Sequence, residues 1–163
     1  MNNCYLLLGG NLGDKEQNLK QAIVLLEQKL GSTAKKSNIF ITAAWGNENQ
    51  PEFYNQAILI NTVLSPKDLL IEILKIEEQI GRKRTNDKWQ ERIIDIDILF
   101  YNYEVIDLPE LKIPHPFIKD RKFVLVPLSE IAGEMVHPVL KKTIETLLSE
   151  CEDVLEVRLK NKK

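Results

Sequence analysis

Apolar and polar positions follow two patterns along the chain, and the two patterns predict strands and helices. The stretches 14–31 and 65–81 carry apolar residues at every third or fourth position, which is the spacing of an amphipathic helix. Shorter runs are rich in apolar residues and have the length of strands. These strand candidates are residues 4–8, 37–42, 55–63 and about 95–101.

The ends of both helical stretches carry residues that cap helices. Asp14 precedes the first helix as an N-cap, and Gly31 is expected to end it. Ser65 and Pro66 mark the start of the second helix, and Gly81 marks its end. The element order is therefore strand, helix, two strands, helix, strand. This order predicts an α+β fold of the ferredoxin-like βαββαβ type, an antiparallel sheet with both helices on one face.

Residues 102–163 follow this unit as a C-terminal extension interrupted by prolines. A helix near 140–150 and a last strand at 154–159 are expected there. The sequence contains no internal repeat, low-complexity stretch or linker. We therefore expect residues 1–163 to form a single domain, which is consistent with the length of the chain.

Composition excludes several classes of function. The chain has 22 basic and 24 acidic residues and a net charge of −2, so no overall field draws it to nucleic acid or to an anionic membrane. No apolar run approaches the roughly 20 residues of a membrane span, and no signal peptide is visible. The two cysteines, Cys4 and Cys151, lack metal-site spacing and suit a reducing compartment. We expect a cytoplasmic monomer that binds small molecules and neither nucleic acid nor membrane.

A cationic segment lies between the second helix and the last predicted strand of the main unit. It holds five basic side chains and the indole of Trp89 against two acidic side chains, a surplus of three positive charges. Because this surplus is local, it suits a small polyanionic ligand better than a duplex. The basic residues are Arg82, Lys83, Arg84, Lys88 and Arg92.

Two carboxylates interrupt the apolar run that follows. In a strand, Asp95 and Asp97 lie on one face while Ile94, Ile96 and Ile98 lie on the other. Two hard oxygen ligands beside a cationic loop suit a polyphosphate held through Mg²⁺, which indicates phosphoryl transfer. The alternative is a structural network in which the neighbouring arginines pair with these carboxylates and no metal is present.

Three further features each allow two interpretations. His115 lies between two prolines that stiffen its loop, as suits a donor to phosphate, or it is structural. The Gly9–Gly13 stretch is a tight strand-to-helix turn or a phosphate-binding loop. Glu77 occupies an apolar position of its helix, where it either forms a surface salt bridge with Lys75 or Arg82 or orients an arginine of the cationic segment.

Arg121 and Phe123 lie two residues apart in a short apolar run and can place a cation and a ring on one face. Phe53 and Phe123 are either core residues or two rings between which a flat ligand lies. The sequence does not choose between these roles.

Several segments together resemble one family, the 6-hydroxymethyl-7,8-dihydropterin pyrophosphokinases of folate biosynthesis. The Arg-x-x-Asp-x-Asp strand and the Pro-His-Pro segment are the most specific of them. The segments keep the family's order and span positions 5 to about 138. They are residues 7–14, 50–55, 76–84, 92–99, 113–116 and 121–128.

The resemblance implies a reaction as well as the ferredoxin-like fold. ATP would give its β,γ-pyrophosphoryl unit to the hydroxymethyl oxygen of the pterin, and AMP would leave. Asp95 and Asp97 would then bind two Mg²⁺ ions that bridge the phosphates. Arg82 and Arg92 would neutralise the charge that develops on the transferred group.

The resemblance also implies two binding surfaces. The pterin would lie between Phe53 and Phe123, where Asn55 and the backbone near Thr42, Ala43 and Trp45 read its hydrogen-bonding edge. The ATP side would be lined by Leu70, Arg84, Trp89, Ile98, His115 and Arg121.

The chain departs from the family pattern at a few positions. Gln90-Glu91 stand where Gly-Pro is usual, Gly10 replaces a serine, and residues 41–44 read Ile-Thr-Ala-Ala. Glu110 and Lys112 lie where some members have further phosphate-binding residues, and no such role is transferred to them. Both predicted metal ligands and both charge-neutralising arginines are kept, so we expect an active enzyme.

Two other classes of function compete with this interpretation. One is a non-catalytic ferredoxin-like module, either a small-ligand sensor or an RNA binder. The other is a different metal-dependent nucleotide transferase with an Asp-x-Asp pair, such as a nucleotide-sugar enzyme. Formation of AMP distinguishes them, because a sugar transferase releases a nucleoside diphosphate.

Overall fold

The computed structural model describes residues 1–43, 49–81 and 93–160. Within this part the chain forms an α/β fold with one main sheet, a small hairpin and four α-helices. The elements, in chain order, are β1 (Asn2–Gly10), α1 (Lys15–Lys29), β2 (Gly31–Lys36), β3 (Phe40–Thr42), β4 (Phe53–Thr62), α2 (Pro66–Ile80), β5 (Asp95–Tyr101), β6 (Ile106–Leu108), β7 (Leu111–Ile113), the 3-10 turn η1 (Ile118–Asp120), α3 (Lys122–Ala132), α4 (Ile144–Glu150) and β8 (Val157–Leu159).

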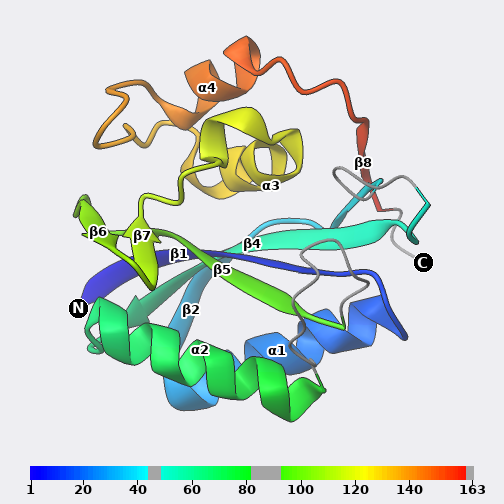
Figure 1. The fold of residues 1–163 in the computed structure, drawn as a ribbon, viewed down its shortest axis with the longest axis vertical. Helices are drawn as coiled ribbons and strands as arrows, with labels where there is room; N and C mark the ends of the chain where they lie inside the picture. The colour runs from blue at the N-terminus through cyan, green and yellow to red at the C-terminus, as the bar shows by residue number, and fades with distance from the viewer. Residues whose placement is uncertain (44–48, 82–92, 161–163) are drawn as a thin grey trace.

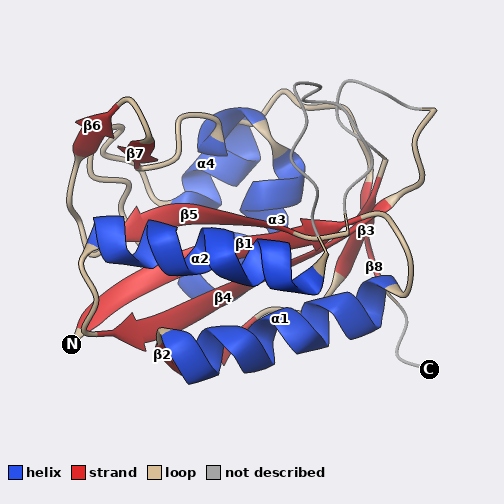
Figure 2. Ribbon diagram, turned by 60° about the horizontal axis from the view of Figure 1, so that its bottom comes forward, coloured by secondary structure: helices blue, strands red, loops and turns tan. Residues whose placement is uncertain are grey.

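The main sheet is antiparallel throughout its described strands. Its order is β5-β1-β4-β3-β8, and β2 pairs with β4 beside β3 (Figure 2). Helices α1 and α2 cover one face, whereas α3 and α4 lie over the other (Figure 1). The expected antiparallel sheet with its first two helices on one face is confirmed, and the C-terminal extension supplies the layer on the opposite face.

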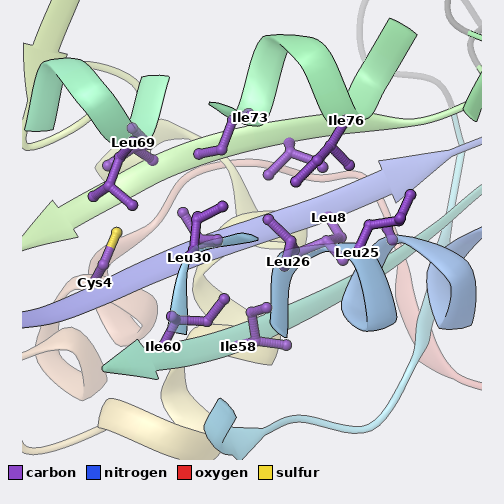
Figure 3. Close-up of a cluster of buried hydrophobic side chains, with 14 of the residues drawn as sticks. Cys4, Leu8, Leu25, Leu26, Leu30, Ile58, Ile60, Leu69, Ile73 and Ile76 are labelled. Atoms are coloured by element: carbon purple, nitrogen blue, oxygen red, sulfur yellow. The ribbon is translucent and has the colours of Figure 1, made fainter. Parts of the chain in front are cut away.

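Alternation along β1 divides the core into two clusters. Cys4, Leu6 and Leu8 are fully buried on the face covered by α1 and α2, where they pack with residues such as Leu26 and Ile73 (Figure 3). Burying each of these leucine and isoleucine side chains contributes roughly 1.5–3 kcal/mol.

The helices of the described residues are all too short or too polar to span a membrane.

The second cluster lies between the sheet and the C-terminal extension. Leu7 of β1 and Phe100 of β5 pack there against Leu125 of α3 and Ile144 of α4, all of them buried. The extension is therefore part of the core, because it buries the face of the sheet that α1 and α2 leave open.

The caps predicted from the sequence are present. Asp14 Oδ1 accepts a hydrogen bond from the backbone N–H of Gln17 at 3.1 Å, and Ser65 Oγ accepts from that of Asp68 at 3.2 Å. Each such cap stabilises a helix by about 1 kcal/mol. Gly81 is the C-cap of α2, as expected.

The strand expected at 37–42 is wrong in its bounds. Within this range only Phe40–Thr42 form a strand, β3, and a separate strand, β2 (Gly31–Lys36), precedes it; both pair with β4. Gly31 begins β2, whereas Leu30 is the C-cap of α1. A Cβ on Gly31 would lie 1.9 Å from the carbonyl oxygen of Asn61, so close approach to β4 requires glycine. The polar β2 lacks the apolar pattern that would have predicted it.

Several elements of the extension differ from expectation. Helix α3 was not predicted, because its apolar run contains Pro127, which cannot donate a helical hydrogen bond. The β6-β7 hairpin was not predicted either. The expected helix near 140–150 is the shorter α4, and the expected last strand at 154–159 is the three-residue β8.

Candidate active site

Asp95 and Asp97 lie on the same face of β5, as the alternation predicted. Across the β1–β5 pair Asp95 is opposite Gly9, and Asp97 is opposite Leu7. Leu7 belongs to the cluster under α3, whereas Ile96 belongs to the cluster under α1 and α2. Because opposite residues of an antiparallel pair share a face, both carboxylates are on the α3 side of the sheet. Both side chains are half-buried.

A cross-strand row connects Asp95 to the predicted pterin residues. Gly9 is opposite Asp95 on one side and opposite Asn55 of β4 on the other. Phe53 lies two residues before Asn55 in β4 and pairs with Thr42 of β3. The side chains on one face of the sheet are therefore those of Asp95, Asn55, Phe53 and Thr42. The register places the predicted metal ligand Asp95 on the same face as three of the predicted pterin residues.

The amide of Asn55 is held in one orientation. Its Nδ2 donates to Thr42 Oγ1 at 3.1 Å, and both side chains are buried, with 3% and 2% of their surface exposed. On the other side, a Cβ at Gly9 would lie 2.6 Å from Asn55 Oδ1. The sequence analysis missed this role of Gly9. It lies within β1, so the stretch 9–13 is in part a strand and only its end is a turn.

Glu77 reaches the same strand from α2. Its side chain is 1% exposed, and its Oε2 accepts a hydrogen bond from the backbone N–H of Ile96 at 2.8 Å. The suggested surface salt bridge with Lys75 is wrong, since Lys75 pairs instead with Glu72 at 3.5 Å. Glu77 thus joins α2 to β5 at the residue between the two aspartates. Its other suggested partners lie in the segment 82–92, outside the described residues.

His115 is fixed beside β5 by its backbone and its ring. Its N–H donates to the carbonyl of Leu99 at 3.1 Å, and its Nδ1 accepts from the N–H of Phe117 at 3.2 Å. The ring proton is therefore on Nε2. Burial and then the nearby Arg121 lower the pKa of His115 to about 4, although Asp95 acts in the opposite direction. At neutral pH the ring is an uncharged donor.

Arg121 lies between two aromatic rings. Its Cζ is 4.5 Å from the ring centroid of Phe117 and 5.6 Å from that of Phe123. The expected proximity of the Arg121 cation and the Phe123 ring is confirmed, and the two residues lie at the start of α3. Phe117 was missed, and its only signal was an aromatic residue two positions after His115. These contacts hold the guanidinium near His115.

A groove of about 250 Å³ runs beside β5. It brings together Leu70, Ile98 and His115, which were predicted for the ATP side, with Asp97. Glu110 and Lys112, to which no role was transferred, also line it. The remaining lining residues are Ile96, Pro109, Leu111 and Pro116.

The donor set for a metal consists of the two aspartates. Among residues 1–43, 49–81 and 93–160, no group of three or more His, Cys, Asp and Glu side chains is arranged to hold a metal. Two carboxylates beside an open groove nevertheless fit Mg²⁺, which keeps several waters and takes its other ligands from substrate phosphates.

Ala43, whose backbone was predicted to face the pterin, follows β3 directly and is half-buried.

Five predicted site residues lie outside the described parts of the chain. Trp45 belongs to the segment 44–48. The other four belong to the segment 82–92, and they are Arg82, Arg84, Trp89 and Arg92.

A family model and two sequence relatives indicate the same family. Residues 5–133 match the model of the 7,8-dihydro-6-hydroxymethylpterin-pyrophosphokinase (HPPK) family. A protein of Aquifex aeolicus is 43% identical over 141 residues, which cover 86% of this chain and 87% of that protein. A Bacillus subtilis protein is 43% identical over 137 residues, covering 83% and 81%. Both are named 2-amino-4-hydroxy-6-hydroxymethyldihydropteridine pyrophosphokinase.

Solved structures show the same fold. The crystal structure of wild-type Plasmodium falciparum HPPK-DHPS with pteroate matches with a TM-score of 0.75 at 20% identity. The match covers 91% of this chain and 44% of that one, so the chain spans less than half of the larger protein.

Proposed function

The chain belongs to the 7,8-dihydro-6-hydroxymethylpterin-pyrophosphokinase family, and from this premise we propose how its residues carry out the reaction. The enzyme transfers a pyrophosphoryl group to hydroxymethyldihydropterin in folate synthesis, with ATP as its co-substrate.

The pterin lies between Phe53 and Phe123 on the α3 face of the sheet. Two rings suit a flat heterocycle by offset stacking. The fixed amide of Asn55, together with Thr42 and the backbone of Ala43, selects its hydrogen-bonding edge. A polar group held in one orientation inside an apolar pocket discriminates strongly, because a wrong ligand leaves it unpaired.

ATP occupies the groove beside β5. Leu70 and Ile98 supply apolar contacts for the base, and His115 directs its Nε2–H into the groove toward ribose or phosphate oxygens. Arg121 contributes a positive charge that the rings of Phe117 and Phe123 hold in place. The neutral histidine donates a hydrogen bond to ATP without adding a second positive charge that would repel Arg121.

Asp95 and Asp97 would hold Mg²⁺, and we propose two ions. When bound, the metal neutralises the triphosphate and favours ionisation of the pterin hydroxyl. The two carboxylates position this charge on a rigid strand whose central N–H is tied to Glu77. Arg82 and Arg92 neutralise charge on the transferred group, and removing either costs about 3–5 kcal/mol in transition-state stabilisation.

The protein contributes alignment and electrostatics, since the hydroxymethyl oxygen attacks the β-phosphorus directly and AMP leaves. We further propose that the β1-α1-β3-β4-α2-β5 unit is a ferredoxin-like core within one domain, and that the enzyme acts as a monomer. The strand order β5-β1-β4-β3 supports the ferredoxin-like assignment.

The row Asp95–Gly9–Asn55 is the observation that carries this proposal, because it joins the metal side and the pterin side on one face. Purified protein given Mg²⁺, ATP and the hydroxymethyl pterin is expected to form AMP and the pterin diphosphate in equal amounts. Folded protein that forms no AMP above background, or that forms ADP in its place, would contradict the proposal.

A further inference from the structure

The segment that leads into β4 is held by three separate elements. Asn11, just after β1, donates from Nδ2 to the carbonyl of Pro51 at 3.0 Å. Lys15 at the start of α1 donates from Nζ to the carbonyl of Glu52 at 2.8 Å. The third contact comes from β8, where Arg158 donates to both carboxylate oxygens of Glu52. Glu52 directly precedes Phe53, so these contacts set the start of the pterin pocket.

The contact between Arg158 and Glu52 is bidentate. Nη1 lies 2.9 Å from Oε2, and Nη2 lies 2.8 Å from Oε1. Both side chains are about half exposed, at 49% and 47%. An exposed pair of this kind adds little to stability, but two parallel hydrogen bonds fix the orientation of the carboxylate.

The backbone of β8 reaches the same pocket by a second route. It pairs with β3, with Thr42 opposite Val157 and Phe40 opposite Leu159. Without β8 the three-residue β3 would be the edge of the sheet, and short edge strands are weakly held. Thr42 is the hydrogen-bond acceptor of Asn55, so β8 also supports the residue that orients the pterin amide.

We propose that Arg158 is a positioning residue for the pterin pocket, acting through Glu52 on Phe53, and that β8 is the element that carries it there. The inference rests on the proposed pterin site. It concerns a part of the chain beyond residues 5–133, which match the family model. Because the pair contributes orientation more than stability, its loss should change pterin binding and leave the melting temperature nearly unchanged.

Arg158→Ala and Glu52→Gln test this role in steady-state kinetics with each substrate varied in turn. The KM for the hydroxymethyl pterin should rise about fivefold in each variant, while the KM for ATP stays within about twofold. The double variant should match Arg158→Ala, because once the guanidinium is gone the change at position 52 has no contact left to weaken. Glu52→Gln leaves β8 intact, so it decides the matter if Arg158→Ala does not fold.

Lys142→Ala is the matched control. Lys142 donates to both carboxylate oxygens of Glu150 at 2.7 and 3.0 Å, and the two side chains are 51% and 46% exposed. This pair lies in the same C-terminal extension, beside α4, and does not touch the segment before β4. Its loss should leave both KM values unchanged.

Equal pterin KM values in Arg158→Ala, Glu52→Gln and Lys142→Ala would overturn the inference, as would additive effects in the double variant. The wild-type protein serves as the separate test of function. If it forms AMP while the variants behave like it, only the positioning role fails. If it forms no AMP, the proposed function itself fails.

Discussion

The amide oxygen of Asn55 fills the space that a side chain at Gly9 would need. The two residues are direct partners in the β1–β4 pair, and a Cβ at position 9 would lie 2.6 Å from Asn55 Oδ1. The amide cannot turn away freely, because its Nδ2 donates to the buried Thr42 hydroxyl. Gly9 of β1 therefore fixes the position of Asn55 in the proposed pterin site.

Gly9→Ala is expected to displace the Asn55 amide and raise the KM for the pterin about tenfold or more, while the KM for ATP changes little. Gly133→Ala is the control, since its Cβ would also lie 2.6 Å from an oxygen, Oε1 of Glu145, away from the site. Both variants should lose stability, but only Gly9→Ala should alter pterin binding. Unchanged pterin kinetics in Gly9→Ala would contradict this role for Asn55.

Glu77→Ala removes the acceptor for the Ile96 N–H between the two aspartates. An unsatisfied buried donor costs about 1–3 kcal/mol. The free energy of unfolding measured with urea should therefore fall by at least about 1 kcal/mol. Turnover should fall as well, because the strand that presents Asp95 and Asp97 loses this hydrogen bond to α2. Glu78→Ala, at an exposed neighbouring position, should change stability by no more than about 0.5 kcal/mol. Similar effects in both variants would argue against the role assigned to Glu77.

Phe117→Ala removes the ring nearest to the Arg121 guanidinium. Such contacts are worth about 0.5–1 kcal/mol at exposed sites, which corresponds to a rise of about two- to fivefold in the KM for ATP. Turnover at saturating ATP should be nearly unchanged. Tyr103→Ala removes another exposed ring, 65% accessible, and should affect neither parameter. A change confined to the pterin KM would reassign Phe117 to the other substrate.

His115 makes stability depend on pH in a defined direction. Its pKa falls from 6.5 to about 4 on folding, chiefly through burial, so the unfolded chain binds the proton more strongly. The stability it contributes is complete above about pH 6.5 and is lost as the pH falls toward about 4. Calorimetry should show a smaller loss of melting temperature over this range in His115→Gln than in the wild type. Burial also lowers the pKa of His137, so some dependence remains. Identical pH profiles would contradict the low pKa.

Features of the fold and the site were predictable from the sequence where residues close together in the chain determine them. Helix caps at Asp14 and Ser65 involve residues three positions apart, so both were predictable. The shared face of Asp95 and Asp97 follows from strand alternation alone. By contrast, Gly9 meets Asn55 only through the register of β1 and β4, which no local pattern specifies.

The same limit explains the errors in the fold. The polar strand β2 exists because it pairs with β4, and its own residues show no strand pattern. Helix α3 contains Pro127 and is apolar over most of its surface, so its residues lack the pattern that predicts an amphipathic helix. The Arg158–Glu52 contact joins residues 106 positions apart, which sequence patterns cannot connect.

We propose that Asp95 and Asp97 bind divalent cations between the protein and the triphosphate. A crystal structure of the protein with Mg²⁺, a non-hydrolysable ATP analogue and the hydroxymethyl pterin tests it most directly. We expect metal ions coordinated by both aspartates and by phosphate oxygens, with the pterin hydroxyl facing the β-phosphorus. Carboxylates bonded only to guanidinium groups, with no ion between them and the phosphates, would contradict the account.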